Sequence, residues 1–158
     1  MTDKKTRALS REKSFGVIPI QREDSSIRVL MVQHQEGQWS FPKGHGEKDE
    51  KPRETARREL FEETGLKVLS WLSPRAFSEN YQFERHGIAI HKEVSYFPAV
   101  VIGEIFLQKK ELKAFRWLKP SDLSSLATFP EMKLICDQFV LWYLQQNRLL
   151  PESPPYSE

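Results

Sequence analysis

FPKGHGEKDEKPRETARRELFEETGL, residues 41–66, carries the most specific pattern in this 158-residue chain. Its second half predicts a helix, because Pro52 suits a first helical turn and Gly65 suits the position just past a helix end. Three carboxylates share about one third of that helix's circumference: Glu59, Glu62 and Glu63. Like charges at this spacing weaken a helix by a few tenths of a kcal/mol per pair. A divalent cation held by oxygen ligands would offset the repulsion, and a solvated acidic face is the alternative for the cluster taken alone.

The carboxylates belong to a longer pattern. From Gly44, five residues lead to Glu50, and seven more lead to the run RELFEETGL at residues 58–66. At every position this resembles the signature of the Nudix hydrolases, and a chance match at one start point is on the order of one in a billion. The resemblance implies an α/β/α sandwich with a mixed β-sheet between helices. It also implies hydrolysis of a phosphate chain with Mg²⁺ as cofactor, with Mn²⁺ as a substitute.

The composition limits the number of domains and the kinds of partner that this chain can have. A chain of 158 residues with 39% apolar content can bury one sizeable core, so one domain is expected. The net charge of +2 is too balanced to indicate nucleic-acid or membrane binding. A single cysteine, Cys136, excludes an internal disulfide and favours a reducing, cytoplasmic setting. The first residues lack a signal-peptide pattern, no apolar run approaches the roughly 20 residues of a membrane span, and a monomer is expected.

The order of elements indicates strands, a helix, strands and a last helix. The near-continuous apolar runs at 14–20 and 27–34 indicate strands covered on both faces, joined by a polar turn at 21–26. Later strands are predicted within 66–72, 76–83, 85–103 and 109–118, with a hairpin around residues 84–87. Asp122 is placed in a turn before a short helix, and the apolar pattern from Pro130 to about Gln146 predicts the last long helix. Residues 1–12 are expected to be a flexible lead-in, 13–147 the domain, and 148–158 a flexible tail.

The resemblance assigns roles within the motif. Glu59, Glu62 and Glu63 would hold the metal, joined by the backbone carbonyl of Gly44, because a few oxygen ligands suffice for Mg²⁺. Arg58 resembles a structural clamp that pairs with a neighbouring carboxylate. Glu50 is expected to orient other groups rather than to bind metal, although both roles remain open.

The general base is left open among three acids, Glu62, Glu63 and Glu111. Glu111 precedes Trp117 by six residues and resembles a carboxylate that many Nudix enzymes carry opposite the helix. It would bind a metal or accept a proton, unless it is a solvated glutamate among lysines.

Three basic side chains are candidates to face the phosphates. Lys43 and His45 flank Gly44, and Lys92 lies on a strand close to Tyr81 if the hairpin is correct. A cation next to several phosphates is a chemical requirement, whereas a solvated loop position is the simpler interpretation of Lys43 and of His45.

Segments outside the motif indicate the substrate. ENYQF, KEVSYFPAV and LATFPEMKLI resemble segments of the asymmetrical diadenosine tetraphosphate hydrolases within the Nudix family, in which two aromatic rings grip an adenine. The matching positions are Tyr81 and Phe129, although a core tyrosine and a hydrophobic contact of the last helix are the simpler alternatives. Tyr96 would line the same pocket or the core. Gln38 departs from the group, several members of which carry histidine before the tryptophan.

The hypothesis from the sequence is therefore Mg²⁺-dependent cleavage of diadenosine tetraphosphate, a dinucleoside polyphosphate, to ATP and AMP. Two alternatives remain. One is a Nudix enzyme acting on RNA 5′ ends or on diphosphoinositol polyphosphates. The other is a catalytically silent Nudix domain that senses nucleotides, although all three motif carboxylates are present.

Overall fold

The computed structural model describes the chain from residue 9 to residue 149, and its side chains as far as residue 146. The strands are β1 (Leu9–Glu23), β2 (Ser26–His34), β3 (Trp39–Ser40), β4 (Lys43–His45), β5 (Lys67–Trp71), β6 (Phe77–Arg85), β7 (Ile88–Ile102) and β8 (Leu112–Leu118). The helices are α1 (Pro52–Thr64), a 3-10 turn (Pro120–Asp122), α2 (Leu123–Leu126) and α3 (Pro130–Leu149).

The described strands form one mixed sheet, in which β3, β2, β1, β7 and β5 lie in that order. The two longest strands, β1 and β7, pair in parallel, and the other pairings are antiparallel. Beside this path, β4 pairs with β1, β6 with β7 and β8 with β2. The turn at His86 and Gly87 closes the expected hairpin and places Tyr81 opposite Lys92.

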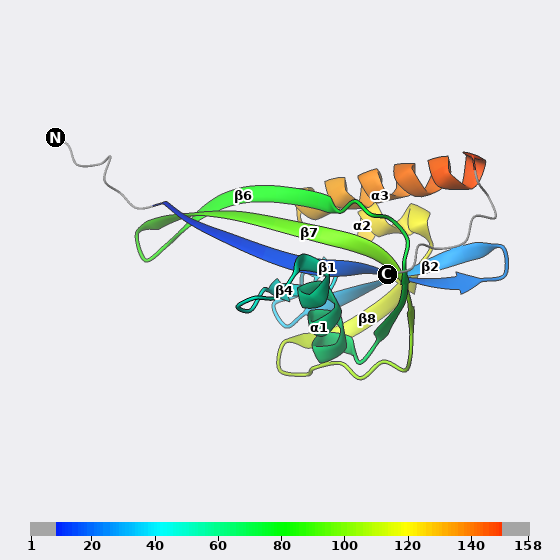
Figure 1. Cartoon of the computed structure of the whole chain (residues 1–158), viewed down its shortest axis with the longest axis horizontal. Coiled ribbons are helices and arrows are strands. Elements are labelled where there is room, and N and C mark those ends of the chain that lie inside the picture. Colours follow the sequence, from blue (N-terminus) through cyan, green and yellow to red (C-terminus); the bar gives the residue numbers. More distant parts are fainter. Residues whose placement is uncertain (1–8, 150–158) are drawn as a thin grey trace.

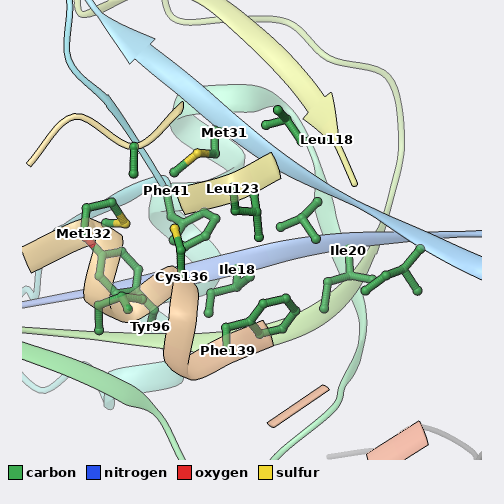
Figure 2. Close-up of a cluster of buried hydrophobic side chains, with 14 of the residues drawn as sticks. Ile18, Ile20, Met31, Phe41, Tyr96, Leu118, Leu123, Met132, Cys136 and Phe139 are labelled. Carbon is green, nitrogen blue, oxygen red and sulfur yellow. The ribbon is translucent and has the colours of Figure 1, made fainter. Parts of the chain in front are cut away.

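Helices cover both faces of the sheet, so the predicted α/β/α sandwich is confirmed (Figure 1). Under α2 and α3, side chains of β1, β2 and β7 meet those of the helices in one apolar cluster (Figure 2). A second cluster lies between the other face and α1, and includes Leu60, Trp71 and Phe97. The central strands are apolar on both sides because both sides are buried. The sheet thus fixes α1 on one face and the start of α3 on the other.

The termini differ in part from the sequence prediction. The lead-in was expected to run to residue 12, but β1 begins at Leu9, because this segment pairs with β7 from Ala89 onward. An ion pair of 2.8 Å between Glu12 and Arg85 adds a side-chain contact there. The tail was expected from residue 148, but α3 continues to Leu149. The remaining residues of both predicted flanks, 1–8 and 150–158, lie outside the described part.

The first turn is also tighter than predicted. A polar turn was expected over residues 21–26, but β1 continues to Glu23 and β2 resumes at Ser26. Only Asp24 and Ser25 separate the strands, and Asp24 adopts a positive φ of 51°. The strands from β5 to β8 and the two long helices lie within a few residues of where the sequence predicts them, whereas the short strands β3 and β4 lie in a segment for which no strand bounds were predicted.

Candidate active site

The acidic helix α1 is held at both ends by local contacts. Its last turn closes where the Gly65 N–H donates to the Phe61 carbonyl at 2.8 Å, with Gly65 at a φ of 81°. That left-handed conformation favours glycine, as expected for this position. At the other end the Lys51 N–H donates to the Glu54 carboxylate at 2.8 Å. The helix therefore begins and ends as its sequence predicts, which sets the direction of its carboxylates.

Arg58 lies at the centre of an ion-pair network. Its Nε donates to Glu50 Oε2 at 2.7 Å, and its Nη1 donates to Glu59 Oε2 and Glu62 Oε1, each at 3.1 Å. Its Nη2 donates to the His45 carbonyl at 2.9 Å. One guanidinium thus joins α1 to the loop before it and to β4, which is the arrangement that the predicted clamp requires.

Glu50 is fully engaged by neighbouring donors. Besides Arg58, the Thr55 hydroxyl donates to its Oε1 at 2.7 Å and the Glu47 N–H donates at 2.9 Å. These hydrogen bonds, the one from Arg58 first, lower the pKa of Glu50 to about 2. A carboxylate with this many partners suits the orienting role better than the metal-binding one.

Glu63 is the most buried acid of the motif, with 5% of its surface exposed. Burial first, and then the Glu59 and Glu111 charges, raise the pKa of Glu63 to about 8, while Lys43 opposes the shift. Its Oε1 has no hydrogen-bond partner. Burial also raises the pKa of Glu59. Two neighbouring acids that both resist ionisation form a site whose charge a cation would stabilise.

The backbone of β4 also contacts one of these acids, Glu59. A Cβ added to Gly44 would overlap the Glu59 carboxylate, so β4 runs directly against this side chain. Glu62 is half exposed and lies one helical turn from Arg58, to which it is paired. Glu111 lies in the turn just before β8 and is exposed, but its charge acts on both Glu59 and Glu63.

These residues fit a hard divalent cation, because they offer it only oxygen atoms as ligands. Glu63 offers an oxygen that has no partner, and the Glu59 carboxylate lies directly against the backbone of Gly44. Within the described residues, no three acidic, histidine or cysteine side chains form a ready-made cluster. Instead, Arg58 Nη1 bridges Glu59 and Glu62. A cation shared by both would therefore require one of them to turn away from this nitrogen.

A pocket of about 510 Å³ opens on the α3 side of the sheet, and none of the motif acids lines it. Lys43 connects the two regions, because it lines the pocket and its charge acts on Glu63. The pocket contains three residues predicted from the sequence, which are Lys43, Tyr81 and Phe129, and it also contains Gln38 and Tyr96. Tyr81 is half buried, whereas Phe129 is 53% exposed and so is not part of the core. The two rings are available to a ligand at one opening.

The other predicted basic residues lie beside this pocket rather than in its lining. His45 Nε2 is 3.3 Å from Lys92 Nζ and 3.5 Å from Glu12 Oε1. Lys92 is 8% exposed, and burial followed by the charge of Lys43 lowers its pKa. His45 and Lys92 thus form a second basic group next to Lys43.

Sequence reasoning missed several lining residues, which are His34, Ser40, Glu79, Gln82, Glu131 and Met132. Glu79 was detectable, because side chains two apart on a strand share a face and Tyr81 follows it at that spacing. His34 donates to or accepts from the Ser40 hydroxyl at 3.1 Å, and burial lowers its pKa. No spacing in the sequence brings His34 next to Lys43, because the contact depends on the turn between β2 and β3.

The fold and the acidic helix together define a Nudix-type hydrolase site, and comparison with known proteins agrees. The model of the NUDIX domain matches residues 10–139, so the chain belongs to this family. Members of the family generally use divalent metal ions such as Mg²⁺. No helix among the described residues is long and apolar enough to cross a membrane.

The chain is also similar to several individual proteins. The chain is 36% identical over 118 residues to the asymmetrical bis(5′-nucleosyl)-tetraphosphatase of Mus musculus, covering 70% of this chain and 77% of that protein. The structure of an Ap4A hydrolase binary complex from C. elegans superposes with a TM-score of 0.66 at 19% identity, covering 85% of this chain and 98% of that one. A MutT protein from Bacillus halodurans gives a TM-score of 0.66 at 27% identity, covering 82% of each chain.

Proposed function

We propose that this protein cleaves diadenosine tetraphosphate asymmetrically, to ATP and AMP, with Mg²⁺ as its cofactor. The observation that carries the proposal is the position of Lys43. This side chain lines the pocket of Tyr81 and Phe129, and its charge also acts on Glu63 among the motif acids. A ligand with a base in the pocket and phosphates at the acids would therefore pass Lys43.

Each group has a physical task in this reaction. Tyr81 and Phe129 hold one adenosine by stacking, which is worth about 1–3 kcal/mol per ring. Holding one end fixes which phosphorus reaches the acids and so makes the cleavage asymmetric. Lys43 pairs with non-bridging phosphate oxygens, and the neighbouring pair of His45 and Lys92 adds positive charge along the path.

The acids of α1 surround the reacting end. Glu59, Glu62 and Glu63, with the Gly44 carbonyl, would hold Mg²⁺, which supplies charge neutralisation on the phosphate oxygens and a more acidic water. Water adds to a phosphorus atom, the bridging P–O bond breaks, and one proton is released to Glu62, Glu63 or Glu111. Arg58 Nη1 holds Glu59 and Glu62 together in the metal-free protein, and one of the two would turn from this nitrogen to the cation when Mg²⁺ binds.

Product analysis tests the proposal. Incubation with diadenosine tetraphosphate and Mg²⁺ in ¹⁸O-labelled water, followed by chromatography and mass spectrometry, should give equal ATP and AMP with the label in one product only. Two ADP molecules, or no turnover, would overturn the proposal. Glu62→Gln should abolish most turnover while ATP still binds, which separates an enzyme from a nucleotide sensor. RNA with a 5′-triphosphate end and a diphosphoinositol polyphosphate serve as competing substrates and should be cleaved far more slowly.

A further inference from the structure

The pocket residue Tyr81 has an aromatic neighbour that lies outside the pocket. Phe83 follows it by two residues on β6, so both side chains lie on the same face of the sheet. Their ring centroids are 6.0 Å apart, and the ring planes are tilted by 32°. Among the described residues, Phe83 is the one ring paired with Tyr81 in this way, and it does not line the pocket. Phe83 can therefore affect a bound base only through its neighbours, of which Tyr81 is the one that stacks.

A charged residue lies next to Phe83 on the side away from Tyr81. The guanidinium carbon of Arg85 is 5.2 Å from the centroid of the Phe83 ring. A guanidinium in this position is attracted to the negative face of an aromatic ring. Arg85 is itself held, because its Nη1 pairs with Glu12 Oε2 on β1 at 2.8 Å. Tyr81, Phe83 and Arg85 thus form a continuous row along β6, with an ion pair at one end and the pocket at the other.

Packing in the core does not account for an aromatic ring at position 83. Tyr81 packs against the apolar cluster under α2 and α3, whereas Phe83 belongs to neither apolar cluster of the described chain. Figure 1 shows the end of the β6–β7 hairpin reaching beyond α1 and α3. Across the hairpin Phe83 lies opposite Ile90, which is 4% exposed. Covering Ile90 requires an apolar side chain, such as leucine, but not a ring.

We propose that Phe83 is a positioning residue, which holds the Tyr81 ring in the orientation that stacks on the base. This inference rests on the proposed nucleotide site. Immobilising one free side chain during binding costs about 2- to 10-fold in affinity, and a ring that is already held avoids this cost. The opposite ring, Phe129, is 53% exposed, so Tyr81 is the better ordered half of the aromatic clamp.

Substitutions at position 83 separate positioning from folding. Phe83→Leu keeps an apolar side chain opposite Ile90 but removes the ring, whereas Phe83→Tyr keeps the ring and is the matched control. ATP binding should weaken about 2- to 10-fold in Phe83→Leu and should change less than about twofold in Phe83→Tyr. Arg85 is a less suitable position, because its partner Glu12 also lies 3.5 Å from His45 on the phosphate side.

Calorimetry with Mg²⁺ in the Glu62→Gln background, which prevents turnover, compares ATP with inorganic tripolyphosphate. Tripolyphosphate has no base, so Phe83→Leu should leave its affinity unchanged while it weakens ATP binding. When Tyr81→Leu is also present, Phe83→Leu should have no further effect on ATP, because the ring that it positions is gone. A general loss of stability would instead weaken both ligands and would act without Tyr81. Melting temperatures confirm that each variant is folded.

Steady-state kinetics of the active enzyme provide a second readout. Phe83→Leu should raise KM for the dinucleotide about 2- to 10-fold and leave kcat nearly unchanged, because the residue acts on base binding and not on the reacting phosphate. An equal fall in kcat would contradict this role.

The outcomes distinguish this inference from the proposed reaction. No ATP binding by the parent protein, equal ATP affinity in Phe83→Leu, an equal loss for tripolyphosphate, or a full effect in the absence of the Tyr81 ring would each overturn the positioning role. Cleavage of diadenosine tetraphosphate would still stand on its own product analysis. Conversely, the expected loss of ATP affinity without cleavage of the dinucleotide would support the positioning role and refute the proposed substrate.

Discussion

The buried acid Glu63 allows a quantitative prediction about the metal-free protein. Its pKa lies near 8 in the folded chain, against 4.5 for an ordinary glutamate. Between these values the folded state binds a proton that the unfolded state has lost. The stability of the wild type should therefore decrease as the pH rises from about 4.5 through about 8. Glu63→Gln removes this titration and keeps a similar shape.

The size of this change in unfolding free energy follows from the pKa shift of Glu63. One pKa unit corresponds to about 1.4 kcal/mol, so the shift of Glu63 sets an upper limit of roughly 5 kcal/mol on the cost of ionising it. Water entry and movement of neighbouring groups relieve part of such a cost. In a chelating buffer, Glu63→Gln should therefore exceed the wild type in unfolding free energy by about 2–4 kcal/mol at pH 8.5, and should match it at pH 5.

Urea unfolding at both pH values measures this difference, and Glu62→Gln is the matched control. Glu62 is 49% exposed and paired with Arg58, so its loss should give no gain in stability at high pH. Saturating Mg²⁺ should reverse the order of wild type and Glu63→Gln, because a ligand stabilises the state that binds it. If Glu63→Gln is no more stable than the wild type at pH 8.5 in chelator, the argument from burial is wrong.

Three further sets of substitutions test other parts of the site. In a Mg²⁺ titration, Gly44→Ala should weaken Mg²⁺ binding at least tenfold, because the added Cβ would displace the Glu59 carboxylate. Gly46→Ala is the control: its added Cβ would lie 3.1 Å from the nearest atom, so this variant should bind Mg²⁺ almost normally. Tyr81→Leu and Phe129→Leu should each raise KM for the dinucleotide about 5- to 100-fold with smaller changes in kcat, since each ring contributes about 1–3 kcal/mol of stacking. Arg58→Lys should lower kcat at least tenfold, because a lysine cannot donate to Glu50, Glu59 and Glu62 together.

Each of these has a result that would contradict it. Equal Mg²⁺ affinities of the two alanine variants would mean that contact between Gly44 and Glu59 does not shape the cation site. A KM unchanged in both leucine variants would place the base elsewhere. Full activity of Arg58→Lys would show that simultaneous donation to Glu50, Glu59 and Glu62 is dispensable.

The sequence predicts the scaffold well because its signals are local. Hydrophobic runs indicate the buried strands, while Pro52 and Gly65 set the limits of α1. The resemblance to the family motif implied that Arg58 pairs with a neighbouring carboxylate, and helix spacing accounts for its contact with Glu62 four residues later. Roles of the motif residues in metal binding and catalysis stay predictions, supported by burial and contact geometry.

Features that depend on distant contacts were not predictable. The pairing of Leu9 with Ala89 extends β1 beyond its apolar stretch, and residues 9–12 alone carry no strand pattern. Likewise, His34 at the end of β2 and Glu131 at the start of α3 line the same pocket only because the tertiary fold brings these two elements together. The sequence also leaves undecided whether Lys43 and His45 act together. In the structure Lys43 lines the pocket, whereas His45 contacts Lys92 and Glu12.

The short strand β4 constrains how this region can change during evolution. Its side chains alternate, so Lys43 and His45 face the α3 side while Gly44 lies against α1. A Cβ at Gly16, the partner of Lys43, would overlap the Pro42 carbonyl, which leaves no room for a shifted pairing. A one-residue shift of β4 along β1 would turn Lys43 to the wrong face of the sheet. At the tip of the β6–β7 hairpin, by contrast, no atom lies near a Cβ added to Gly87, so only the positive φ of 75° favours glycine there.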